Sequence, residues 1–147
     1  MREIKFRAWY KGNPYLAKPI PAQMVYDIHK RHEAWPFSCR TFGGLIDSGD
    51  FIVMQYTGLK DKQWEKEIYE HDIIQFAIFD YNGHDTQYKG VVVFDGGQWQ
   101  IWRTKDDPYF GSDVPFNLYM VWYNDDELEV IGNIYEHPHL LKGDGNE

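Results

Sequence analysis

The order of hydrophobic and polar positions along the chain predicts short strands rather than long helices. Residues 2–10 alternate apolar and basic side chains, which is the period of two that a strand with one buried face produces. Gly12-Asn13-Pro14 follows, and residues of these types usually end a strand in a turn. Residues 51–56 form a second apolar run, which Thr57-Gly58 is expected to close.

Further strands are predicted in the second half of the chain. Residues 68–79 are apolar at many positions, as in a strand buried on both faces, and Asn82-Gly83 is a hairpin turn signal. Residues 90–103 hold two short runs around Asp95-Gly96-Gly97, which predicts a hairpin. Residues 128–134 form the last strand, with a bulge expected at Gly132-Asn133.

The remaining segments have weaker patterns. Residues 22–33 place apolar side chains at helical spacing, which favours a short helix, and residues 34–50 have the composition of a loop. Residues 118–123 fit either a strand or a helix, and their β-branched and aromatic side chains favour a strand. Residues 138–141 are expected to add one helical turn.

These elements together predict a mainly β fold with three parts. Residues 1–50 are expected to form one strand and an irregular segment, including the short helix, that packs on the rest. Residues 51–141 are expected to form a small β-barrel or roll, because closure of the sheet leaves no long exposed edge. Residues 142–147 are expected to be a disordered tail.

Composition indicates the cellular compartment in which the protein is expected. The single cysteine, Cys39, excludes an intrachain disulfide and a cysteine-based zinc site within one chain, which suits a reducing compartment. The first residues are charged and do not look like a signal peptide, and no apolar run approaches the roughly 20 residues of a membrane helix. We therefore expect a cytoplasmic protein that does not interact with membranes.

Charge is unevenly distributed along the chain. Residues 1–47 carry eight Lys/Arg and four Asp/Glu, whereas residues 48–147 carry seven and nineteen. A basic segment lying against an acidic body explains this, as does a nucleic-acid-binding arm or an acidic surface that imitates nucleic acid. The N-terminal basic residues are dispersed, so the first explanation is favoured and nucleic-acid binding is not expected.

Two long blocks of sequence resemble the YopX family of phage and prophage proteins. The first block covers residues 55–62, 66–70 and 72–74, and the second covers residues 129–136; residues 2–9 are similar as well. The resemblance implies an SH3-like barrel or roll and a phage or prophage origin. It also implies self-association, with a trimer as one candidate assembly. It implies no known reaction.

The chain departs from the family pattern at two places. Gln63-Trp64-Glu65 stands where the family usually has an Asn-Gly turn, and His71 stands where it usually has glycine. If that glycine needs a positive φ, His71 must tolerate the same conformation or the turn is reshaped.

Several groups of residues have the side chains of metal sites or catalytic groups. His29 and His32 with Glu33, and His137 and His139 with Glu136, are candidate metal ligands, but solvated surface histidines explain both groups better.

Other chemistry has weaker support. Cys39 beside Arg40 has no histidine near it in sequence, and the acidic run Asp125, Asp126, Glu127 and Glu129 lacks the spacing of a calcium loop. No phosphate-binding glycine motif is present. We therefore expect no catalytic residues, no cofactor and no metal, and do not expect an enzyme.

Aromatic side chains are the remaining candidates for function, because binding surfaces use tyrosine and tryptophan often. The candidate interaction surface comprises Tyr56, Trp64, Tyr69, His71, Trp99 and Trp102. The favoured function is a module that binds a host or phage protein. The alternatives are an acidic decoy of a host DNA-binding protein, a nucleic-acid binder through the N-terminal basic residues, and, last, a metal-dependent enzyme.

Overall fold

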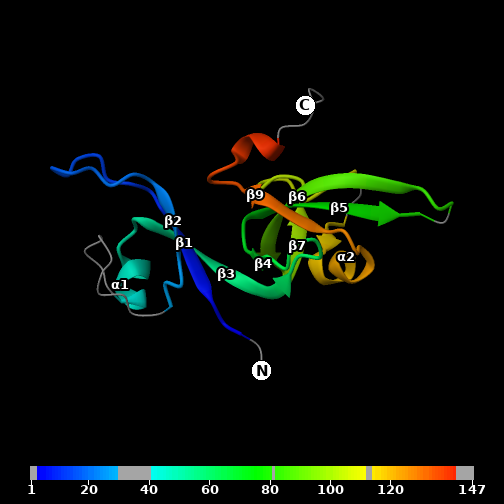
Figure 1. Cartoon of the computed structure of the whole chain (residues 1–147), viewed down its shortest axis with the longest axis horizontal. Helices are drawn as coiled ribbons and strands as arrows, with labels where there is room; N and C mark the ends of the chain where they lie inside the picture. Colours follow the sequence, from blue (N-terminus) through cyan, green and yellow to red (C-terminus); the bar gives the residue numbers. More distant parts are fainter. Residues whose placement is uncertain (1–2, 30–40, 81, 112–113, 142–147) are drawn as a thin grey trace. The chain divides into compact units, whose positions relative to one another are not determined.

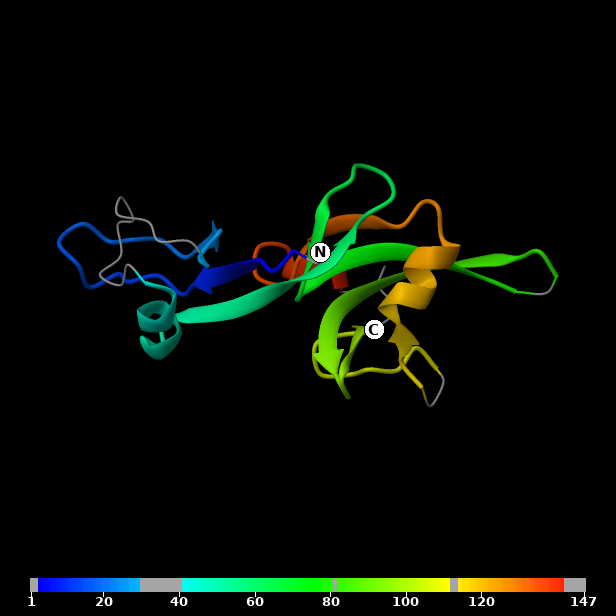
Figure 2. The same ribbon diagram turned by 90° about the horizontal axis from the view of Figure 1, so that it is seen from below.

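The computed structural model describes residues 3–29, 41–80, 82–111 and 114–141 (Figure 1). The chain is mainly β, with one four-stranded and one five-stranded sheet, and the larger sheet is curled (Figures 1 and 2). The predicted fold class, a small β-barrel or roll, is therefore confirmed. The chain divides into two compact units, Met1–Tyr56 and Thr57–Glu147, called here the N-terminal and C-terminal units.

The N-terminal unit is built on three antiparallel strands. They are β1 (Phe6–Tyr10), β2 (Gln23–Tyr26) and the first part of β3 (Phe51–Lys60). The middle strand is β1, in which Ala8 lies opposite Val25 on one side and Val53 on the other. The alternation that predicted a strand over residues 2–10 is thus confirmed for the part that pairs.

The prediction of a helix over residues 22–33 is wrong for its first half. Residues 23–26 form β2, because β1 offers a backbone ladder that local helical spacing cannot reveal. Asp27, with φ 56, then ends the strand. Residues 30–33 lie outside the described residues.

A short helix does occur in the N-terminal unit, within residues predicted as loop. It is α1 (Phe42–Asp47), and the Thr41 side chain accepts a hydrogen bond of 3.1 Å from the Gly44 N–H at its start. Leu45 of this helix is fully buried among core residues of the unit. The composition of residues 34–50 favours a loop, but the N-cap and the buried leucine stabilise this helix.

The C-terminal unit contains the larger sheet, in the order β8-β7-β6-β5-β9. The strands are β5 (Asp72–Phe79), β6 (Asp85–Asp95), β7 (Gln98–Trp102), β8 (Phe116–Asn117) and β9 (Glu129–Asn133). Both predicted hairpins, β5–β6 and β6–β7, are confirmed, and glycines with positive φ occupy their turns.

Two strand boundaries differ from the prediction. Thr57-Gly58 does not close a strand, because β3 continues through Gly58 at φ 90 to Lys60 and pairs with β4 (Glu67–Tyr69). The apolar run of residues 68–79 is two strands, β4 and β5, since the chain turns at Glu70-His71. Hydrophobicity alone does not mark this turn.

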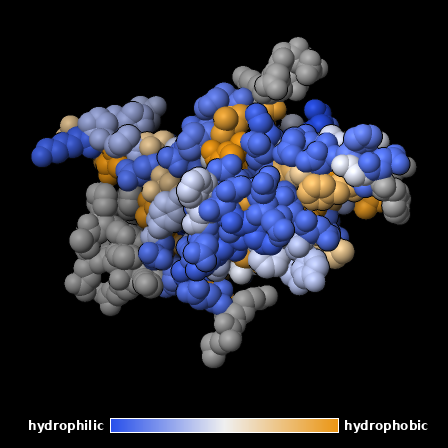
Figure 3. Space-filling model, turned by 45° about the vertical axis from the view of Figure 1, so that its right-hand side comes forward, coloured by the Kyte–Doolittle hydropathy of each residue, from blue (hydrophilic) through white to orange (hydrophobic). Residues whose placement is uncertain are grey.

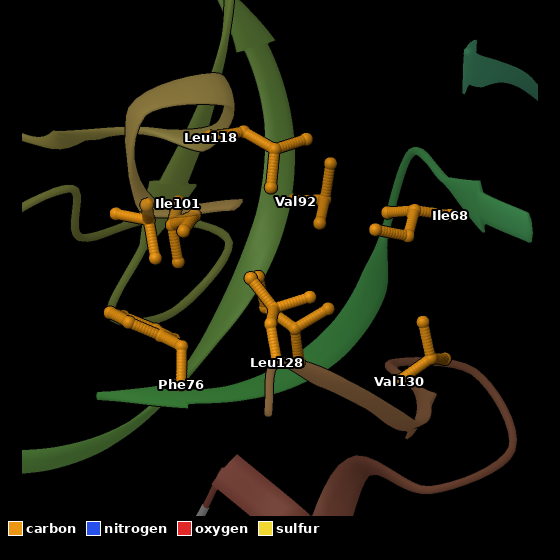
Figure 4. Packing of buried hydrophobic residues seen from close by; sticks show 9 residues of the cluster. Ile68, Phe76, Val92, Ile101, Leu118, Leu128 and Val130 are labelled. Atoms are coloured by element: carbon orange, nitrogen blue, oxygen red, sulfur yellow. The ribbon is translucent and has the colours of Figure 1, made fainter. Parts of the chain in front are cut away.

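The core of the C-terminal unit lies inside the curled sheet (Figure 4). It contains Ile68, Ile74, Phe76, Val92, Ile101, Leu118, Val121, Leu128 and Val130. Rings of Tyr88, Phe110 and Phe116 surround Phe76 at centroid distances of 5.6–6.0 Å. Gly90 is needed beside this core, because a Cβ there would lie 2.5 Å from Ile101 Cγ2.

The segment favoured as a strand over residues 118–123 is a helix, α2 (Leu118–Asn124). The Asn117 side chain accepts a hydrogen bond of 3.0 Å from the Met120 N–H, and this N-cap outweighs the β propensity of the segment. Leu118 and Val121, three apart, are its buried residues.

Two smaller predictions near the end of the chain are confirmed, although the bulge lies one residue earlier than the predicted Gly132-Asn133. Pro138–Leu141 form one turn of 3₁₀ helix, η1. In β9, Gly132 lies opposite Ile73 and Val130 lies opposite Ile74, so Ile131 is an extra residue and the strand is bulged.

Candidate functional site

Two of the six aromatic or histidine residues expected at an interaction surface are buried. The Tyr56 side chain is 5% exposed, and Lys5 Nζ lies 5.6 Å from the centre of its ring. Tyr69, 3% exposed, is buried in the C-terminal unit, and its N–H donates to Asp72 Oδ2 at 2.7 Å. Neither ring is available to a partner at the surface.

The three tryptophans of this set have different surroundings. Trp64 is 67% exposed, and its indole N–H donates to Glu129 Oε2 at 2.8 Å. Trp99 packs against the core cluster, whereas Trp102 lies on the other face of β7 and donates from its indole N–H to Gln100 Oε1 at 2.8 Å. The three rings therefore do not form one surface.

His71 adopts the left-handed conformation that the family glycine suggested. Its φ is 70, and its backbone N–H donates to the Val92 carbonyl at 2.7 Å while its carbonyl accepts from the Ile134 N–H at 3.2 Å. Its Nδ1 lies 2.8 Å from the Tyr135 hydroxyl. The backbone and ring contacts hold His71 in a conformation that costs a non-glycine residue about 1–2 kcal/mol.

The candidate metal ligands near the C-terminus hold a loop together. Asn133 is buried; its side-chain oxygen accepts from the Tyr135 and Glu136 N–H groups, and its side-chain amide donates to Glu136 Oε1 at 2.9 Å. His137 Nδ1 accepts from the Asn133 N–H at 3.3 Å, and the His139 ring centre lies 6.3 Å from that of His137. Glu136 and His137 thus have a structural role as hydrogen-bond partners.

Of the other candidates for metal or nucleophilic chemistry in the N-terminal unit, the structure describes His29. His29 Nδ1 accepts from the Phe6 N–H at 3.3 Å, and His32, Glu33 and Cys39 lie outside the described residues. Among the residues that the structure describes, no group of three or more His, Cys, Asp or Glu side chains is placed to hold a metal ion.

The acidic run is also partly structural. Asp125 is buried, and its carboxylate accepts from the Ala77 N–H at 2.8 Å and the Glu127 N–H at 2.9 Å. Glu129 accepts from Trp64, whereas Asp126 and Glu127 are exposed.

The C-terminal unit has a groove that the sequence did not predict, here called the β5–α2 groove. It has a volume of about 830 Å³. The end of β5 and the residue after it, β8, and one side of α2 supply its lining: Ala77, Ile78, Phe79, Asp80, Phe116, Asn117, Met120, Val121 and Asn124. Figure 2 shows the β5–β6 hairpin extending past α2 at this place.

Large hydrophobic side chains are exposed in the groove and elsewhere on α2. Phe79 is 55% exposed and Met120 is 56% exposed, and both line the groove. Tyr119 and Tyr123 of the same helix are 53% and 65% exposed, with ring centres 6.2 Å apart. In Figure 3, hydrophobic surface interrupts the polar surface on the side of the view where the β5–β6 hairpin lies.

A prediction of a helix for residues 118–123 would have indicated some of these exposed side chains. Tyr119 and Tyr123 are four apart and Met120 and Tyr123 are three apart, so on a helix Tyr123 neighbours both of the other side chains. The strand prediction places Tyr119 and Tyr123 on one face and Met120 on the opposite face, which hides the cluster.

The described residues therefore form a small, mainly β module with an apolar groove on its C-terminal unit. Residues 5–142 match the YopX protein family, and the chain belongs to this family. No curated protein matches the chain. The chain is similar to the crystal structure of protein EF1440 from Enterococcus faecalis, with a TM-score of 0.49, 23% identity and coverage of 96% of this chain and 99% of that one.

The helices of the described segments are also too short or too polar to cross a membrane.

Proposed function

We propose that the chain is a non-enzymatic, protein-binding module of a phage or prophage, which acts in the cytoplasm of a bacterial host. The observation that carries the proposal is that Phe79 and Met120, each more than half exposed, both line the β5–α2 groove, while Tyr119 and Tyr123 are exposed on the same helix. Exposed apolar side chains gathered in one place are typical of binding sites, because water contact with them is unfavourable until a partner covers them.

The acidic-decoy alternative has less support than a groove-binding module. A decoy needs a free carboxylate array, but within the acidic run Asp125 is buried against the Ala77 N–H and Glu129 accepts from Trp64. Only Asp126 and Glu127 of that run are exposed.

The test compares protein retention from nuclease-treated host lysate by the full chain and by two variants. Met120→Asp places a charge in the groove, and Tyr15→Ser removes an aromatic ring that is 94% exposed in the N-terminal unit. We expect a partner that the wild type and Tyr15→Ser retain and Met120→Asp loses. Equal retention by the wild type and both variants, or loss of every partner on nuclease treatment, contradicts the proposal.

A further inference from the structure

The last residues of β5 have a backbone edge that no described strand covers. On one side, β5 pairs with β6 as far as Phe79, which lies opposite Asp85. On the other side, β9 pairs only with the residues from Asp72 to Gln75. The β5 backbone from Ala77 to Phe79 is therefore paired on one side among the described residues.

The direction of the backbone groups follows from one hydrogen bond. The Ala77 N–H donates to Asp125 Oδ2 at 2.8 Å, away from β6. Along an antiparallel strand, residues two apart direct their N–H and C=O groups to the same side. The Ala77 carbonyl and the Phe79 N–H and C=O therefore face away from β6, at the margin of the β5–α2 groove, which both residues line.

A small acidic pocket adjoins the same edge. It has a volume of about 110 Å³, and Ala77 lines both it and the groove. Its charged lining residues are Asp125, Glu127 and Glu129, and no Lys or Arg is among its described lining. Glu127 is exposed, so a cationic side chain can approach it from solvent.

We propose that an extended segment of a protein partner binds as an added strand beside Ala77–Phe79. Its backbone pairs with the open edge, its apolar side chains enter the groove against Met120 and Phe79, and a Lys or Arg near its Ala77 end meets the acidic pocket. Main-chain pairing gives such complexes affinity, and pockets for alternate side chains give them specificity. This inference rests on the proposed function and names the chemistry of the partner.

A second copy of the chain fits this edge less well than a basic segment does. If two β5 edges paired antiparallel, Asp80, which follows Phe79, would approach the acidic pocket of the other copy. Like charges placed opposite each other are destabilising, so charge favours a basic partner.

The probe is a library of random twelve-residue peptides displayed on phage and selected on the full chain. We expect selected sequences to alternate apolar and polar residues, with Lys or Arg concentrated near one end. The best peptide is then synthesised, and its affinity is measured by fluorescence anisotropy. N-methylation of its alternate backbone amides on the pairing side is expected to weaken binding about tenfold, because it removes two or so main-chain hydrogen bonds.

Two further measurements locate the contact. Exchange of the Phe79 amide hydrogen is expected to slow when the peptide binds, since that N–H becomes paired. Glu127→Lys is expected to weaken binding about two- to fivefold, as for an exposed ion pair, whereas the matched control Asp106→Lys changes it less than twofold. Circular dichroism checks that each variant is folded.

The outcomes separate this inference from the proposed function. If Met120→Asp abolishes binding but N-methylation and Phe79 exchange have no effect, the groove binds a partner without strand addition, and only this inference fails. If Met120→Asp has no effect either, both fail. If no peptide is selected, the inference is overturned; light scattering then shows whether a second copy occupies the edge instead.

Discussion

The two halves of β5 are similarly apolar but differ in what covers them. Residues 73–75, here called the closed half, pair on both sides, and residues 77–79, the open half, pair on one side. Ile73 and Ile74 are fully buried, with β6 on one side and β9 on the other. Ile78 and Phe79 are just as hydrophobic but pair only with β6, and Phe79 is 55% exposed. The difference shows that one apolar strand can contribute to the core at one end and expose hydrophobic side chains to solvent at the other.

The closed half is also secured by side chains from outside the sheet. The Asp61 carboxylate accepts from the Val130 N–H of β9 at 3.0 Å and from the Trp64 and Lys66 N–H groups at 2.9 and 3.0 Å. The open half has one comparable contact, from Asp125 to the Ala77 N–H. Stability should therefore depend strongly on the first half and weakly on the second.

The most direct test is to truncate one residue in each half. Ile74→Ala should lower the free energy of unfolding by about 2–5 kcal/mol, because it leaves a cavity in a fully buried cluster. Phe79→Ala should lower it by less than about 1 kcal/mol, since the ring is largely solvated. Urea denaturation measures both, and equal losses would show that the open half is covered in solution.

The next effect concerns the carboxylate that holds the closed half. Asp61→Ala should cost about 3 kcal/mol or more, because three backbone N–H groups lose a charged acceptor. Asp126→Ala, at a side chain that is 97% exposed, is the matched control and should change stability by less than about 0.5 kcal/mol. A loss of under about 1 kcal/mol for Asp61→Ala would contradict its anchoring role.

A smaller effect is expected at the turn that leads into β5. His71→Ala loses the contact with the Tyr135 hydroxyl and keeps the left-handed φ of 70, whereas His71→Gly loses the contact and relieves the strain. His71→Gly should therefore be more stable than His71→Ala by about 1 kcal/mol. Thermal unfolding of the two variants compares them, and the reverse order would mean that the turn adopts another conformation.

The smallest expected change in stability is at Asp107, an exposed carboxylate. The backbone N–H of Tyr109, and then the Arg103 guanidinium, lower the pKa of Asp107 below its usual 3.8. A carboxyl with a lowered folded pKa stabilises the protein above its unfolded pKa, and this contribution is lost as the pH falls through the folded pKa.

Wild type should therefore be slightly more stable than Asp107→Asn at neutral pH, and the difference should vanish in strong acid. Urea midpoints at the two pH values measure it. A difference that grows in acid has the wrong sign and would contradict the pKa assignment.

The parts of the fold that sequence predicted are those set by local chemistry. The Asn82-Gly83 and Gly96-Gly97 turns identified both hairpins, because few residues other than glycine adopt a positive φ without strain. The identity of β2 was missed because it depends on pairing with β1, a partner thirteen or more residues away in sequence.

The candidate site was harder to predict for the same reason. Helix α2 depends on one capping side chain, Asn117, and the open edge of β5 depends on where β9 stops pairing. Aromatic content singled out Tyr56 and Tyr69, which are buried, because composition does not tell core rings from surface rings. The family pattern left two outcomes open at His71, a positive φ or a reshaped turn, and the structure has the positive φ.

The Asp125 carboxylate has one more consequence, for colloidal behaviour. An open strand edge beside exposed apolar side chains is a template for uncontrolled aggregation, and proteins blunt such edges with charge or with groups that occupy the ladder. Asp125 occupies the ladder at Ala77, and the net charge of −8 makes the molecules repel one another. Because Asp125 shortens the open edge and the net charge keeps molecules apart, we expect little tendency of identical chains to add to one another as strands.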